Sequence, residues 1–254
     1  PAASPYMAVL VADGYRMGQI ISKCYSLDQL SSLSLTLSLY AEESQKIIAK
    51  HNGSLDYAGG DDVLAFLPLD TCFVAAAELS NAFITKVGQS VENCQPTLSV
   101  GVTINHFLDP LSDILERARN TEGFAKERGR NGLAVTFYKR SGGDPIRVFS
   151  KWSNNPVNQI EAWISLFKQK SIPHKLAYEL HELFNFYNNF YENSCNNLKF
   201  ENVEEALFND VSRLIKRKDV ANKDVLEQMK TLLFLNMDKP GEENLKVFES
   251  NVLL

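Results

Sequence analysis

The sequence has few cysteines and no long apolar run. Its four cysteines form no Cys-x-x-Cys pair, which argues against a zinc knuckle and favours small buried side chains in a reducing cytosol. No apolar segment reaches the length of a membrane span, and residues 1–5 lack the basic flank and apolar stretch of a secretory signal. We therefore predict a cytoplasmic protein with no membrane contact.

An excess of positive charge is also missing. There are 26 Lys and Arg residues against 31 Asp and Glu residues, a net charge of −5. Affinity for RNA would therefore come from partners or from local patches such as residues 216–218. The 254 residues can form one large domain or two ordinary ones. No methionine starts the chain, and a strand is expected almost at once near Tyr6, so we expect a piece of a longer protein.

Two glycines and two aspartates stand between strand-like segments in GSLDYAGGDDVLAFLPL, residues 53–69. The alternation on either side predicts a hairpin with Gly59 and Gly60 as its two-residue connection. Asp61 is then held at the turn, and Asp62 enters the second strand. Adjacent carboxylates repel each other unless a cation lies between them, which favours a site for a divalent metal ion. An ordinary turn is the alternative, because Gly and Asp are common in turns.

The rest of the first half predicts a ferredoxin-like α+β domain. The apolar run 7–12 is typical of a buried strand, and it delivers a third carboxylate, Asp13, at its end. Asp13 and the Asp61–Asp62 pair are expected on neighbouring strands at one edge of the sheet. The predicted helices are 27–50, 72–87 and 110–128, and the further strands are 54–58, 63–67, 97–104 and 132–138.

After residues 139–145 the composition changes to Leu, Phe, Glu and Lys with apolar stripes at helical spacing. We place the domain boundary between residues 148 and 149 and expect 149–254 to be an all-α interaction domain without chemistry. The expected helices are 156–169, 173–191, 203–217 and 222–237, with a last short helix after a linker at 237–244.

The spacing of the polar residues in the first domain is typical of phosphoryl transfer. Three carboxylates from two adjacent strands can hold two divalent cations that bridge a nucleotide triphosphate. The segment from Gly14 to Gly18 is expected to be a loop whose backbone N–H groups approach phosphate oxygens. Lys126, near the end of the third helix, is expected at the same edge, either for the phosphates or for the helix dipole.

Five ordered motifs in residues 6–143 carry a family resemblance: VLVADGYRMG, YAGGDDVLAFLPL, TLSVGV, GRNGLAV and KRSGG. Together they resemble the catalytic palm of the large subunit of type III CRISPR effector complexes, which has a GGDEF-like nucleotidyl cyclase fold. The helical 152–254 is similar in character to that subunit's C-terminal domain. The resemblance implies that target-RNA binding by a complex with guide RNA and other subunits switches on conversion of ATP into cyclic oligoadenylates, with release of pyrophosphate.

The resemblance also implies roles for individual residues. Asp13 and Asp61 would be ligands of Mg²⁺ or Mn²⁺, and Asp62 would be a ligand or the acid–base partner, so Asp61 and Asp62 are the catalytic pair. The residues that would bind the nucleotide are Gly14, Ser34 near the adenine, Gly59, Gly60 and Lys126.

Two departures from the family leave alternatives open. The family commonly has Asp-Gly-Asp in its first motif, whereas this sequence has Tyr15 after Asp13-Gly14. No histidine is followed directly by aspartate, so DNA cleavage by an HD site is not predicted, and the family's second, degenerate palm is not found. We therefore expect the isolated chain to be inactive as a cyclase. The alternatives are an inactive palm-type scaffold subunit and a GGDEF-type cyclic dinucleotide cyclase.

Overall fold

The computed structural model describes residues 4–15, 17–88, 96–193, 200–217 and 223–233. The chain divides into two compact units, Pro1–Ser153 and Asn154–Leu254, which we describe separately. This division falls a few residues after the boundary predicted at 148/149, because a strand that was not predicted, β6, occupies Ile146–Lys151.

The first unit is built on one six-stranded sheet with the order β2-β3-β1-β4-β5-β6. All neighbours pair antiparallel except β4 and β5, which are parallel. The first four strands with the helices between them have the ferredoxin-like arrangement, which confirms the predicted α+β fold class. The bounds are β1 Tyr6–Tyr15, α1 Met17–Ser22, α2 Leu27–Lys50, β2 Ser54–Gly59, β3 Asp62–Leu67, α3 Cys72–Gly88, β4 Thr97–His106, α4 Leu111–Glu127 and β5 Gly132–Phe137.

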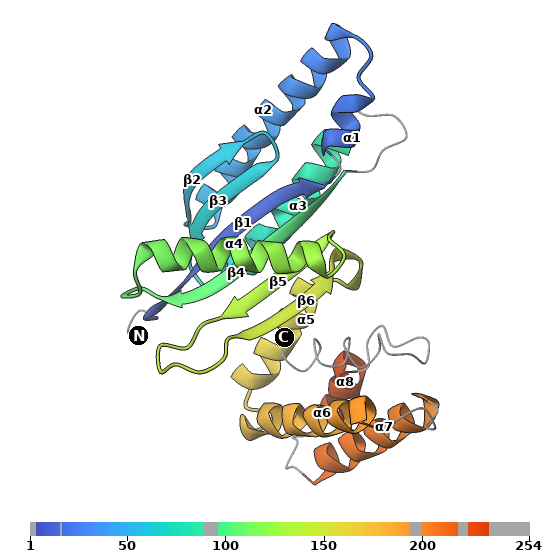
Figure 1. Ribbon diagram of the computed structural model, residues 1–254. Coiled ribbons are helices and arrows are strands. Elements are labelled where there is room, and N and C mark those ends of the chain that lie inside the picture. Colours follow the sequence, from blue (N-terminus) through green and yellow to red (C-terminus); the bar gives the residue numbers. More distant parts are fainter. Residues whose placement is uncertain (1–3, 16, 89–95, 194–199, 218–222, 234–254) are drawn as a thin grey trace. The chain divides into compact units, whose positions relative to one another are not determined.

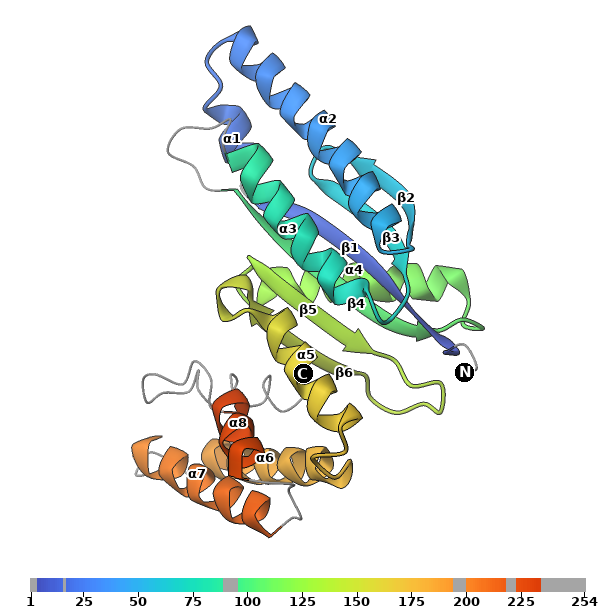
Figure 2. The same cartoon turned by 180° about the vertical axis from the view of Figure 1, so that it is seen from behind.

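Helices cover both faces of this sheet. Helix α4 crosses one face, and α1, α2 and α3 lie on the other (Figures 1 and 2). Val9 of β1 packs with Ile114 and Ala118 of α4, whereas its neighbours Ala8 and Leu10 are buried toward the opposite side. A strand covered on both faces is apolar at every position, which explains the continuous run 7–12. Alternate side chains of β1 therefore belong to different layers.

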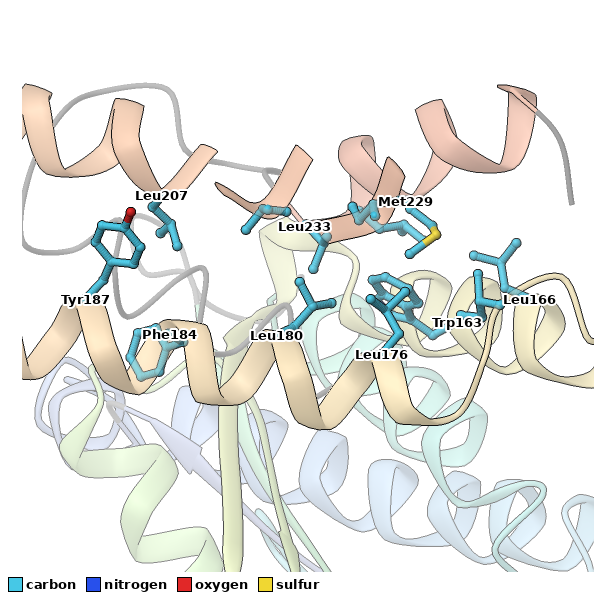
Figure 3. Packing of buried hydrophobic residues seen from close by; sticks show 13 residues of the cluster. Trp163, Leu166, Leu176, Leu180, Phe184, Tyr187, Leu207, Met229 and Leu233 are labelled. Carbon is cyan, nitrogen blue, oxygen red and sulfur yellow. The ribbon is translucent and has the colours of Figure 1, made fainter. Parts of the chain in front are cut away.

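The second unit is entirely helical within its described residues, with α5 Pro156–Lys168, α6 Lys175–Asn193, α7 Phe200–Lys216 and α8 Lys223–Leu233. A short 3₁₀ turn, Trp152–Asn154, precedes it. Figure 3 shows its core, in which Trp163, Leu176 and Phe184 pack with Leu207 and Met229. The linker expected at 237–244 and the last short helix lie outside the described residues.

Two remaining expectations concern membranes and cysteines. In the described part of the chain, none of the helices combines the length and the apolar character needed to cross a bilayer. Cys72 is buried, and burial raises the pKa of its thiol to about 12. Cys24 is half-buried and also free, while Cys94 and Cys195 lie outside the described residues.

Candidate functional site

The hairpin that carries the two aspartates turns one residue later than predicted. Gly59 pairs with Asp62 at the ends of β2 and β3, so the connection is Gly60–Asp61 and not Gly59–Gly60. Gly60 has φ +65°, whereas Asp61 is not in the positive-φ region, which is the requirement of a type II′ turn. The turn therefore fixes Asp61 at the tip and leaves Asp62 as the first residue of β3.

Asp61 lies against Gly14 near the end of β1. A Cβ atom added at Gly14 would lie 2.7 Å from the Cβ of Asp61 and 2.7 Å from Cζ of Phe83 in α3. Oδ2 of the Asp61 carboxylate would lie 2.9 Å from the same added Cβ atom. A side chain at residue 14 would fill the space that Asp61 occupies.

The segment from Gly14 to Gly18 is not the loop that the sequence predicted, because its described residues belong to a strand and a helix. Gly14 and Tyr15 continue strand β1, and Gly18 lies in the short helix α1; Arg16 lies outside the described residues. The physical reason is that Gly14 pairs with Leu98 of β4, so its backbone continues the ladder beside Asp61. Whether this backbone meets a nucleotide remains a prediction.

A second group of charged residues meets on the α4 face of the sheet. Nζ of Lys126 lies 3.1 Å from Oδ1 of Asp13 and 3.0 Å from Oε1 of Glu122, one helical turn earlier. Asp62 also belongs to this group, because it lies close enough to Asp13 for a side-chain hydrogen bond. The predicted meeting of Asp13, Asp62 and Lys126 at one sheet edge is what the structure shows.

Glycine at residue 101 of β4 lets α4 lie directly on the sheet. A Cβ atom there would come within 2.7 Å of Cα of Glu122 and would also overlap its backbone nitrogen. Thr121 of the same turn donates a hydrogen bond to Thr136 of β5, with 2.9 Å between the two oxygens. This close packing carries Glu122 and Lys126 to the end of β1, where Asp13 lies.

Burial and neighbouring charges raise the pKa values of three carboxyl groups at the site. Burial, followed by repulsion from Asp13, raises the pKa of Asp61. Burial and repulsion from Asp61 and Asp13 raise that of Asp62. Burial also raises the pKa of Glu122, although Lys126 opposes the shift. Burial lowers the pKa of Lys126, but its contacts with Glu122 and Asp13 outweigh burial, so the net shift is upward. Lys126 thus pairs with two carboxylates, Asp13 and Glu122, while Asp62 adds a further negative charge beside Asp13.

This donor set suits a hard divalent cation. Mg²⁺ is usually bound by one or two carboxylates and completes its shell with water and substrate phosphates. Among the described residues no group of three or more His, Cys, Asp or Glu side chains converges as ligands. Asp61 packs beside Phe83 of α3, whereas Asp13 meets Lys126 of α4, so the carboxylates approach the sheet end from different sides. The residues therefore fit an ion shared with a phosphate group.

One predicted residue, Ser34, lies on helix α2, and two residues that the sequence analysis missed lie beside the charged group. Ser34 is exposed on α2, where its carbonyl accepts a hydrogen bond from the Ser38 hydroxyl. Glu122 was missed, although its position four residues before Lys126 is a visible signal for an ion pair. Arg130 was also missed; its guanidinium lies 4.7 Å from the ring centre of Tyr15, the residue that replaces the family's second aspartate.

Comparison with known proteins places this geometry in a family. Residues 6–134, which include every strand of the site, match the family described as Cas10/Cmr2, second palm domain. The chain belongs to this family. The expectation that the family's second palm is the degenerate one is therefore wrong, because the residues that carry Gly59–Asp62 are themselves the second palm domain.

The chain matches only a part of a much longer relative. Over 168 residues the chain is 33% identical to the CRISPR system Cmr subunit Cmr2 of Pyrococcus furiosus, a match that covers 54% of this chain and 19% of that protein. The chain thus spans about a fifth of that relative's length.

Two solved structures share the fold of the Cas10/Cmr2 palm. A Csm1–Csm4 cassette in complex with cA4 matches with a TM-score of 0.57 and 18% identity, covering 98% of this chain and 35% of that one. A Csm1–Csm4 cassette in complex with pppApA matches with a TM-score of 0.55 and 19% identity, covering 72% and 29%.

Proposed function

We propose that this Cas10/Cmr2 palm binds ATP with Mg²⁺ or Mn²⁺ and supplies the nucleotidyltransferase centre of a type III CRISPR effector complex. The reaction joins ATP molecules into cyclic oligoadenylates, with loss of pyrophosphate, when the complex binds target RNA. The two matched Csm1–Csm4 structures are complexes with cA4 and pppApA, which are adenylate oligomers, and this supports adenine as the base.

The observation that carries the proposal is that Asp13, near the end of β1, and Asp62, at the start of the neighbouring strand β3, lie beside Lys126, with Asp61 at the adjoining hairpin tip. Burial and repulsion from Asp61 and Asp13 raise the pKa of Asp62, and a bound cation would relieve that repulsion. A fold that only needed a turn would gain nothing from this arrangement.

Each residue has a distinct part in the proposed reaction. Asp13, Asp61 and Asp62 would hold the divalent ions, which neutralise the triphosphate when bound. Lys126 would donate hydrogen bonds to phosphate oxygens, for which a flexible ammonium is suited. Asp62 is more exposed than Asp61, and its raised pKa suits it to accept the proton of an attacking 3′-hydroxyl.

Cyclisation is proposed to need more than this chain. Joining two nucleotides requires an acceptor hydroxyl in line with the α-phosphate of a second ATP, and such positioning supplies much of the rate. One palm offers one such triphosphate site. The purified chain should therefore bind ATP and release it unchanged, while the other palm and an RNA-loaded complex should restore turnover.

Calorimetry with ATP in the presence and absence of Mn²⁺ tests the proposal. The wild-type chain should bind ATP only with the metal, and the double variant Asp61→Ala, Asp62→Ala should lose that binding. Asp56→Ala is the matched control, since Asp56 is an exposed carboxylate on the other strand of the same hairpin. Equal ATP affinity in the double variant would refute the site.

The same titration separates the alternatives. Tyr15 in place of the second aspartate favours an inactive scaffold, which would bind no ATP with or without Mn²⁺. A GGDEF-type dinucleotide cyclase would prefer GTP to ATP, so GTP is titrated in parallel. The family's chemistry would be supported by a clear preference for ATP.

A further inference from the structure

The cation nearest to Asp13 is supplied by the protein itself. Nζ of Lys126 lies 3.1 Å from Oδ1 of Asp13. The ammonium group therefore stands close to where a metal ion bound to this carboxylate would lie. The Lys126 side chain is 30% exposed and that of Asp13 is 28% exposed, so both groups remain open to solvent and to a ligand. The ammonium group thus neutralises a carboxylate that the proposed function assigns to the metal.

Lys126 is also held from its other side. Glu122 lies one turn earlier on α4, and its Oε1 is 3.0 Å from the same Nζ. The Glu122 side chain is only 10% exposed, and the packing of its backbone on Gly101 leaves α4 no room to move toward the sheet. Glu122 is therefore a fixed partner, whereas Asp13 is the more accessible one.

We propose that Lys126 is an internal counter-ion which a divalent metal displaces from Asp13, and that Glu122 is the positioning residue that keeps the released ammonium beside the triphosphate. This inference rests on the proposed function and names a step within it. A metal ion at Asp13 repels the ammonium group, while Glu122 goes on attracting it. Metal binding and triphosphate binding are thereby coupled through one side chain.

The geometry favours such an exchange over a permanent ion pair. A lysine has a flexible stem and three donors, so it can leave one carboxylate while it keeps another. An ion pair that solvent still reaches contributes little to stability, so metal coordination at Asp13 readily exceeds it. The order of Glu before Lys at a spacing of four residues is the favourable one on a helix, and it holds Lys126 in the last turn of α4.

The test measures two affinities on the full chain: that of Mn²⁺ alone, by electron paramagnetic resonance of the free ion, and that of ATP in excess Mn²⁺, by calorimetry. Lys126→Met should bind Mn²⁺ alone about two- to fivefold more tightly, because the competing ammonium is gone. The same variant should bind ATP about tenfold or more weakly, because a charged donor to phosphate is lost. Lys126→Arg keeps the positive charge and should stay close to wild type for Mn²⁺.

A double-mutant cycle isolates the part of Glu122. Glu122→Gln should weaken Mn²⁺ binding in the wild-type background, since Lys126 then pairs with Asp13 alone. In the Lys126→Met background the same change should have a clearly smaller effect. Equal effects in both backgrounds would show that Glu122 acts as a general charge and would overturn its positioning role.

Two controls keep the outcomes distinct. Lys50→Met removes an ion pair to Glu78, 2.8 Å long, from another part of the same unit and should change neither affinity. Circular dichroism confirms that each variant is folded. If wild type binds neither Mn²⁺ nor ATP, the proposed function fails and this inference with it. If wild type binds both and Lys126→Met gains no Mn²⁺ affinity, only the counter-ion inference fails.

Discussion

Gly14 lies against the side chain of Asp61, so that a methyl group at residue 14 would come within 2.7 Å of the Asp61 Cβ. The end of strand β1 and the tip of the β2–β3 hairpin are therefore packed directly against each other. The position of the hairpin carboxylate depends on the absence of a side chain on the neighbouring strand.

Gly14→Ala should displace Asp61 and destabilise the protein by about 1–3 kcal/mol, the usual cost of overpacking. Metal-dependent ATP binding should weaken at the same time. Urea unfolding and calorimetry measure the two effects. Gly18→Ala is the control, because nothing lies within 4 Å of a Cβ at that position in α1. Equal stability of the two variants would contradict the packing described for Gly14.

Gly101→Ala and Gly123→Ala should have opposite effects on the free energy of unfolding. A Cβ at Gly101 meets the backbone of Glu122 and Thr121 in α4, which cannot rotate away, so we expect a loss of about 1–3 kcal/mol or more. Gly123 lies inside α4 with nothing within 4 Å of its Cβ position, so alanine there should stabilise by about 0.5–1 kcal/mol. Thermal unfolding of both variants checks the signs.

Gly101 also shows how far the fold could be predicted from the sequence. The apolar run 7–12, the glycine-aspartate hairpin and the helical periodicities identified β1 to β5 and helices α2 to α8, because burial on regular elements leaves a repeating pattern. The contact between Gly101 and Glu122 leaves no such pattern, since it depends on which turn of α4 crosses which residue of β4.

Three errors have the same origin. Strand β6 was missed because Ile146–Lys151 mixes charged and apolar residues after a Gly-Gly-Asp-Pro segment, where its pairing with β5 is a tertiary effect. The turn was shifted by one residue because Gly59 and Gly60 are equally permissive, and only the pairing of Gly59 with Asp62 decides. The loop predicted after Asp13 was wrong because the ladder to β4 continues through Tyr15.

Asp61→Asn should raise the thermal midpoint in metal-free buffer at neutral pH. The folded-state pKa of Asp61 is raised, chiefly by burial and also by Asp13, so its ionised form opposes folding. A raised carboxyl pKa favours the folded state below the unfolded pKa, and this contribution is lost as pH rises through the folded value. The advantage of the variant should therefore shrink as pH falls through the folded-state pKa and should be gone below about 4, the unfolded value.

Added Mn²⁺ should reverse the order of the two proteins, because a ligand that binds only the folded wild type stabilises it selectively. Midpoints measured by differential scanning fluorimetry with Mn²⁺ and with a chelator provide the comparison. A variant that is less stable than wild type in both buffers would show that the lost hydrogen-bond acceptor outweighs the relieved repulsion.

Glu78→Gln should remove the part of the folding stability that the wild-type protein loses when the pH is lowered into the acid range. Glu78 of α3 lies 2.8 Å from Nζ of Lys50 and 3.3 Å from Nε2 of His51, at the end of α2. Burial would raise the pKa of Glu78, but these two partners outweigh it, so the net shift is downward. A lowered carboxyl pKa gives stability that is present above the unfolded value and is lost as pH falls through the folded value.

The stability difference between wild type and Glu78→Gln should therefore be about 1 kcal/mol or less at pH 7 and should decrease below about pH 4.5. Urea unfolding between pH 3 and pH 7 follows it. A difference that stays constant over this range would mean that the carboxylate charge is not what joins α2 to α3.

Truncation after Ser153 should leave the first unit folded, whereas truncation after Val148 should not. The shorter fragment cuts strand β6 in half and removes Lys151, which donates hydrogen bonds to the carbonyls of Gly129 and Arg130. It also removes Trp152, whose indole N–H donates to the carbonyl of Leu98, 2.8 Å away, and whose backbone N–H donates to that of Asn131. These bonds fasten the loop between α4 and β5, and the start of β4, to the end of β6 and the residue after it.

That loop begins two residues after Lys126 and carries Arg130, so the loss of these bonds should reach the proposed site as well as the fold. The fragment ending at residue 153 is expected to unfold cooperatively and to keep metal-dependent ATP binding, because every strand and helix around Asp13, Asp61 and Asp62 is present. Circular dichroism and calorimetry on both fragments decide the matter. Loss of ATP binding in a folded 1–153 fragment would show that the helical unit takes part in the nucleotide site, since the sheet would then be intact and still insufficient.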